Sequence, residues 1–224
     1  MPTLGRGDEI MATEFASASY TAGQLNAMVK LLRKQAGTED GPERFLRGEL
    51  TVSEPTRSWR EQDGIIYFSV TSDGTTGEEW ITRLESKGFR VGENYTKNVL
   101  RSQDFKPTKG MTTEIAILKG TLFEDKDRVT SNIRADATGR KFRKPNAEVA
   151  CLIREKFTDG EIRTMGLIWI VVMHEPIKDS SGGPSLLVVY RLGGGRCLRA
   201  SNDGHFLRWD RGRGFAFAVS KIST

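Results

Sequence analysis

The stretch Gly166–Met173, GLIWIVVM, is the longest uninterrupted apolar run in the chain and decides the centre of the fold. A short apolar run rich in β-branched residues is typical of a strand buried on both faces. We therefore expect a central strand over residues 167–173. The run ends in His174-Glu175-Pro176, and the chain holds only two histidines. A histidine at the end of the most buried strand is the first candidate for a site.

Strands are expected to dominate the chain after this run. Four short apolar segments follow it, separated by glycine-rich turns: LLVVY (186–190), RCLRA (196–200), HFLRW (205–209) and FAFAV (215–219). Their spacing of about ten residues predicts an antiparallel β meander. Helical spacing precedes the central run and predicts helices over 125–137, 146–157 and 159–165.

Helices and strands mix in the region before residue 120. The pattern predicts a strand over 65–70, a helix from the Thr76 and Glu79 capping box to residue 87, and a strand over 89–91. These three elements are expected to form a compact β-α-β unit. A helix over 95–102 and a strand over 113–118 complete this region. Mixed elements followed by clustered strands indicate an α+β fold rather than a doubly wound sheet.

A small helical hairpin is expected before this main domain. Thr21 and Gln24 form a capping box for a helix over 22–36, and Gly37 ends that helix. Pro42 begins a second, shorter helix, PERFLRG. The predicted organisation is a flexible tail over 1–19, a hairpin over 20–52, a linker over 53–63 and a mixed main domain over 64–224. The helix pair resembles a helix-turn-helix only superficially, and we favour a structural helical hairpin. Docking of a protein partner on residues 21–48 is one of the alternatives for function.

Composition indicates a soluble cytoplasmic protein. The chain has 224 residues, of which 37% are hydrophobic and 28% charged. No apolar run approaches the roughly 18 residues of a membrane span, and the N-terminus lacks the apolar segment of a signal peptide. Two cysteines, Cys151 and Cys197, do not make a disulfide framework, which favours a reducing compartment. We predict no membrane partner.

Positive charge is concentrated in the second half of the chain. Residues 1–111 carry 15 Lys and Arg against 16 Asp and Glu, whereas residues 112–224 carry 19 against 13. Because the formal excess of +5 belongs to the C-terminal half, an anionic partner is expected there.

Two clusters of cations lie in this half. The first centres on GRKFRKP, residues 139–145, where Phe142 stands among cations in an expected loop. The second is all arginine and alternates with aromatic residues. Phosphate contacts by cations and stacking on aromatic rings are how many proteins hold nucleic acid. The sequence therefore predicts DNA or RNA binding by nine residues: Arg140, Lys141, Phe142, Arg143, Lys144, Arg208, Trp209, Arg211 and Arg213.

An enzyme acting on a phosphate-bearing substrate is the alternative. The expected strand-to-helix loop SDGTTG could hold a phosphate on its backbone N–H groups and hydroxyls, at Ser72, Thr75, Thr76 and Gly77. The predicted catalytic residues are His174, Glu175 and Asp73, since an imidazole and carboxylates can exchange protons near neutral pH. This hypothesis needs strands 65–70 and 167–173 to be neighbours with their carboxyl ends on the same side.

The plainer interpretations stay open beside these. The 72–77 loop matches no phosphate-binding glycine motif and could be an ordinary capped turn. His174 could be a hydrogen-bonded histidine at a strand end. Cys151, His174, Cys197 and His205 lack the close spacing of a structural zinc site, so we predict no metal and no cofactor. Surface arginines can also serve solubility alone, which leaves a protein-interaction role as a third possibility.

Overall fold

The structure, a computed structural model, describes residues 21–51, 57–192, 195–204 and 207–220. The chain divides into two compact units, Met1–Thr56 and Arg57–Thr224. The tail predicted over 1–19 lies outside the described residues. Among the described helices, none has the length and apolar content needed to cross a membrane.

The first unit contains a pair of helices, as the sequence predicts. Helix α2 (Ala22–Ala36) begins with the Thr21–Gln24 capping box and ends at Gly37, which adopts the left-handed conformation. Helix α3 (Gly41–Leu46) follows and packs on α2. Gly41 permits this contact, because a Cβ there would lie 2.5 Å from the carbonyl oxygen of Leu32.

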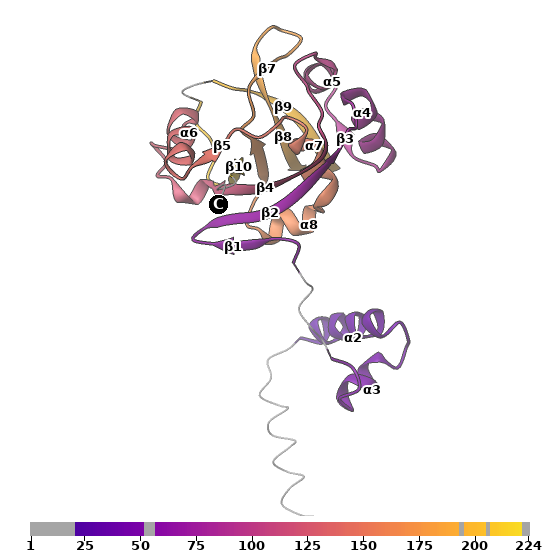
Figure 1. The fold of residues 1–224 in the computed structure, drawn as a ribbon. Helices are drawn as coiled ribbons and strands as arrows, with labels where there is room; N and C mark the ends of the chain where they lie inside the picture. The colour runs from indigo at the N-terminus through magenta and orange to yellow at the C-terminus, as the bar shows by residue number, and fades with distance from the viewer. Residues whose placement is uncertain (1–20, 52–56, 193–194, 205–206, 221–224) are drawn as a thin grey trace, which may run out of the picture. The chain divides into compact units, whose positions relative to one another are not determined.

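The second unit is a mixed sheet flanked by helices (Figure 1). Its strands are β1 (Arg60–Gln62), β2 (Ile65–Asp73), β3 (Arg90–Val91), β4 (Lys109–Lys119), β6 (Trp169–Val172), β8 (Pro184–Leu192), β9 (Gly195–Asn202) and β10 (Arg213–Val219). They lie in the order β1-β2-β4-β10-β6-β8-β9-β3. Two short strands pair off this path: β5 (Phe142–Arg143) with β10, and β7 (Ile177–Lys178) with β8.

The helices divide between the two faces of the sheet. The larger core lies under α4 (Gly77–Ser86), α5 (Asn94–Arg101), α7 (Val149–Lys156) and α8 (Asp159–Thr164). A smaller core on the other face lies under α6 (Thr130–Gly139) and includes Trp209 and Phe215. The 3₁₀ turn η1 (Gly120–Leu122) leads from β4 toward α6. Strand residues that alternate between these two cores explain why the central run is apolar throughout.

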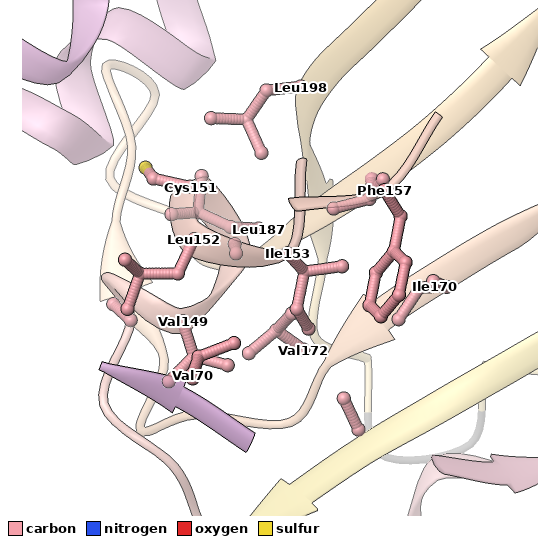
Figure 2. Close-up of a cluster of buried hydrophobic side chains, with 14 of the residues drawn as sticks. Val70, Val149, Cys151, Leu152, Ile153, Phe157, Ile170, Val172, Leu187 and Leu198 are labelled. Atoms are coloured by element: carbon pink, nitrogen blue, oxygen red, sulfur yellow. The ribbon is translucent and has the colours of Figure 1, made fainter. Parts of the chain in front are cut away.

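Helix α7 is the centre of the larger core. It contacts β2, β6, β8 and β9, so strands that are far apart in the sheet order all reach it. Figure 2 shows Val149, Leu152 and Ile153 of this helix beside Val70 of β2 and Val172 of β6. The sheet therefore curls around α7.

The strand order corrects the predicted meander. Strands β8 and β9 form the expected antiparallel pair, but β10 lies between β4 and β6 and runs parallel to β6. Within the predicted strand 205–209, Arg208 makes an isolated bridge with Val129, and residues 205–206 lie outside the described residues. Spacing along the chain indicates the strands but not their partners.

Two further expectations need correction. Strands β2 and β3 do not form a compact β-α-β unit, because β3 lies at the opposite end of the sheet order from the β1-β2 end. The predicted linker 53–63 contains β1, and Trp59 is buried in the larger core. The boundary between the units therefore falls before Arg57 rather than after residue 63.

Candidate nucleic-acid interface

The loop 72–77 is closed by its own side chains. Asp73 accepts hydrogen bonds from the Thr75 backbone N–H (3.1 Å) and hydroxyl (2.5 Å), and it pairs with Arg83. Arg83 also reaches Glu155, at 2.5 and 2.6 Å. The hydrogen bond from Thr75 and then that from Arg83 lower the pKa of Asp73 to about 2. Asp73 is therefore ionised near neutral pH and is a poor proton acceptor.

The groups at the start of helix α4 also bond to or contact other parts of the protein. Thr76 and Glu79 form the predicted capping box, so the hydroxyl and N–H of Thr76 both bond to the Glu79 carboxylate. A Cβ at Gly77 would lie 1.7 Å from the carbonyl oxygen of Leu100, at the end of α5. Thr75, Thr76 and Gly77 thus make internal contacts where the sequence placed a phosphate. Ser72 is separate from them, buried and bonded to the backbone of Met111.

His174 is held by backbone groups on both sides of its ring. Its Nε2 accepts from the Leu187 N–H at 2.9 Å, and its Nδ1 lies 2.6 Å from the carbonyl oxygen of Glu175. The ring is 1% exposed, and burial lowers the pKa of His174 to about 4. It is therefore neutral near pH 7, with both nitrogens used.

The other predicted catalytic groups do not join His174. The carboxylate of Glu175 is exposed and pairs with Lys144 at 2.5 Å. Strands β2 and β6 do run parallel, with their carboxyl ends on the same side, but β4 and β10 lie between them. Three strand spacings separate them by about 14 Å. The neighbouring strands that the enzyme hypothesis requires are therefore absent.

Part of the basic excess is structural. Arg128 is buried and donates to the carbonyl oxygens of Gly120, Phe123 and Trp209. Arg154 is fully buried and donates to the Phe157 carbonyl oxygen. These two arginines stabilise the fold through hydrogen bonds to the backbone, and because they are buried they are not accessible to a partner.

The two aromatic residues proposed for stacking differ in burial. Trp209 is 3% exposed, and its indole N–H donates to the Thr130 hydroxyl at 3.0 Å. Phe142 is half-buried and packs edge-on against Tyr67, with ring centroids 6.5 Å apart. The Trp209 ring therefore cannot stack on a base, and the alternation of aromatic and basic residues along the chain does not reveal this.

The seven predicted cations differ in their partners. Arg140 pairs with Asp136, Lys144 with Glu175, and Arg213 with Asp210. Arg213 also lies over the ring of Trp169, at 4.0 Å from its centroid. Within the described part of the chain, four of the seven form no salt bridge: Lys141, Arg143, Arg208 and Arg211.

These four cations fall at the two ends of helix α6. Lys141 and Arg143 follow the helix. Arg208 bridges to Val129, the residue before the helix. Arg211 comes two residues after Trp209, whose backbone N–H donates to the carbonyl oxygen of Arg128, just before the helix. Ten residues at ~1.5 Å each set the two ends about 15 Å apart.

A cavity of about 270 Å³ opens beside Arg143 and Lys144. Ser72, predicted for phosphate, lines it together with these two predicted cations. Glu148, which the sequence did not single out, also lines it and is 3% exposed. A lone glutamate at a helix start gives no signal of this in sequence. An adjoining hollow of about 280 Å³ shares Met111, Thr113 and Arg143 with the cavity.

Comparison with known proteins identifies no relative: no family model, curated protein or solved structure matches the chain. Among the described residues, no three His, Cys, Asp or Glu side chains are grouped as metal ligands would be. Both cysteines are buried. Function is therefore inferred from charge and geometry alone.

Proposed function

We propose that the unit Arg57–Thr224 binds nucleic acid through the cations at the two ends of α6. The observation that carries this proposal is the set of four cations that form no salt bridge with any described residue, two at each end of one helix. An interval of about 15 Å lets the two pairs contact separate phosphates along one strand. Because the Trp209 ring is buried and the Phe142 ring is half-buried against Tyr67, phosphate contact, rather than stacking, is the main source of affinity.

Two of the three paired cations, Arg140 and Lys144, extend this surface. The third, Arg213, is mostly buried and lies over the rings of Trp169 and Trp209. Surface ion pairs contribute about 0–1 kcal/mol, because solvent screens them. A phosphate can therefore replace the exposed carboxylate partner of Lys144 at little cost. Arg140 and Asp136 share one helix turn and are both partly exposed, so the same holds for them.

Fluorescence anisotropy with labelled single-stranded DNA, duplex DNA and RNA tests this proposal. Four phosphate contacts predict a log–log dependence of affinity on salt with a slope of about −3 for single strands. The double variant Lys141→Glu, Arg208→Glu reverses one charge at each end of α6. We expect it to weaken binding at least tenfold and to reduce the slope by about 2.

The matched control reverses two exposed charges elsewhere in the same unit, Arg163→Glu on α8 and Lys178→Glu on β7. Both double variants change the net charge equally. If the control weakens binding as much as the α6 variant does, net charge rather than this surface is responsible. A flat salt response in the unaltered protein would contradict the proposal outright.

A second function is favoured by one observation on the helix pair. None of the residues of α2 is buried. Five large apolar side chains of the helix pair are exposed: Leu25, Met28, Leu31, Phe45 and Leu46. An exposed apolar group of this size on a small unit is typical of a docking surface. We propose that residues 21–48 dock a protein partner. A partner captured by the full chain and lost when residues 1–56 are removed is the expected result.

A further inference from the structure

The cavity beside Arg143 lies where the sheet opens. Strand β10 pairs with β4 from Gly214 to Ala218, and along its other edge Ala218 and Val219 pair with Arg143 and Phe142 of β5. Strand β4 continues without β10 toward Lys109, still paired with β2. The cavity fills the resulting gap at the carboxyl ends of β2 and β10, and the turn before α7 closes it.

One wall of the cavity holds a buried carboxylate. Glu148 accepts hydrogen bonds from the Thr108 backbone N–H at 2.9 Å and from the Thr108 hydroxyl. A carboxylate has about four acceptor positions, so about two remain. Among the described residues, no cationic nitrogen lies within 4.0 Å of it. A buried carboxylate without a cation is costly unless further donors complete its hydrogen bonds.

The remaining walls are mostly apolar. Val149 and Leu152 of α7 lie beside Val70 at the end of β2 (Figure 2), and all three line the cavity. Ala218 lines it from β10. At the rim stand Arg143 and Lys144, which belong to the proposed phosphate-binding surface. The cavity thus combines an apolar slot, an acceptor inside it and cations at its mouth.

The geometry points to a base-recognition pocket that takes one guanine of a bound single strand. This inference rests on the proposed function and deepens it. Arg143 and Lys144 hold the phosphate, the ring enters between the apolar walls, and Glu148 accepts from the Watson–Crick edge. Enzymes and binding proteins that read an unstacked base combine these same elements.

Guanine fits the acceptor better than the other bases do. Its Watson–Crick edge carries two adjacent donors, N1–H and the N2 amino group, which a carboxylate can accept together. Adenine and cytosine place a ring nitrogen acceptor beside their amino group, and that lone pair would face the carboxylate. Uracil and thymine flank their single N–H with two carbonyl oxygens. A paired donor contact of this kind discriminates by about tenfold or more.

The test compares labelled single-stranded oligonucleotides of twelve thymidines with the same strand carrying one central guanosine. We expect the guanosine strand to bind about tenfold more tightly to the full chain. Glu148→Gln should bring the ratio of the two affinities close to one, because an amide offers one acceptor and adds a repelling donor. The control, Glu85→Gln on α4, removes the same charge outside the cavity and should keep the tenfold ratio.

A second variant tests the pocket without changing Glu148, in case Glu148→Gln impairs folding. Thr113 is half-buried on β4 and lines both hollows, so Thr113→Tyr should fill the pocket while an aromatic residue keeps the strand. It too should remove the preference for guanosine. Salt-sensitive binding of both strands with equal affinity would overturn the pocket and leave the proposed function standing.

Binding of guanosine monophosphate alone tests the pocket independently of strand binding. Ligand-observed NMR should detect its binding to the full chain, and the signal should be lost in Glu148→Gln and Thr113→Tyr. If the mononucleotide binds in this way while neither strand does, the pocket stands and the proposed strand-binding function fails. Absence of a signal together with equal strand affinities overturns the inference.

Discussion

Both ring nitrogens of His174 are bonded to backbone groups of neighbouring segments, and this decides how its charge is linked to folding. The folded pKa of about 4 lies below the ordinary value of 6.5. Between these values the unfolded chain binds a proton that the folded chain does not. Stability is therefore complete above pH 6.5 and falls by about 1.4 kcal/mol for each unit of acidification toward pH 4.

We predict that His174→Gln loses about 1–3 kcal/mol of stability at pH 7, because a buried hydrogen bond is lost. At pH 5 the difference in stability from the unaltered protein should shrink by about 2 kcal/mol. Only the unaltered protein loses stability through protonation of His174 in its unfolded state. Urea unfolding at the two pH values measures both numbers. A constant difference would mean that the imidazole titrates in the folded state as it does in the unfolded chain.

Single residues show where sequence reasoning succeeds. The capping boxes of Thr21 and Thr76 were predictable, since each joins residues three apart. The role of Asp73 was not, because its partner Arg83 also binds Glu155, 72 positions further on. Likewise the sequence indicates that Trp209 alternates with arginines but not that Thr130 accepts its N–H. Contacts between distant segments leave no periodic trace in the chain.

At the level of elements, the close approach of α4 and α5 depends on Gly77. A Cβ there would lie 1.7 Å from the Leu100 carbonyl oxygen, and backbone cannot move aside as a side chain can. We predict that Gly77→Ala destabilises the fold by about 1–3 kcal/mol through overpacking. The denaturation midpoint in urea should fall while the slope stays constant.

Gly160 provides the matched control for this change. It also stands in the first turn of a helix with a capping box, α8, but a Cβ there meets only the Thr158 hydroxyl at 3.8 Å. Gly160→Ala should leave stability unchanged or raise it by up to about 1 kcal/mol, since alanine restricts the unfolded chain. Equal losses in the two variants would show that helix starts, not the α4–α5 contact, are sensitive.

Elements were easier to predict than their arrangement. The sequence indicated each of the strands β2, β4, β8 and β10, because each contains a short, mostly apolar segment of five or six residues. It suggested that β10 would lie beside a strand over 205–209, in a meander that follows the order of the chain. In the structure β10 lies between β4 and β6. This position depends on how the whole sheet packs around α7 and not on a local sequence pattern. The candidate cavity arises from this arrangement, so it could not be predicted either.

At the scale of the whole molecule, the chain divides into two units, Met1–Thr56 and Arg57–Thr224. Trp59 belongs to the core of the second unit, and Arg57 lies over its ring at 5.1 Å from the centroid. Every cation proposed for nucleic-acid binding also belongs to the second unit. The first unit contributes its own charges, among them Lys30, Arg33 and Lys34. The two proposed functions therefore fall on separate parts of the chain.

We predict that a chain lacking residues 1–56 folds and keeps its affinity for single-stranded DNA. Its free energy of unfolding should change by less than about 0.5 kcal/mol, as is usual when distant, independent parts are altered. The log–log dependence of its affinity on salt should keep a slope of about −3, because the four cations at the ends of α6 remain. Circular dichroism in urea and the same anisotropy titration measure the two quantities. A slope reduced by 2 or more would assign part of the phosphate contact to α2, and the hairpin would then serve nucleic acid rather than a protein partner.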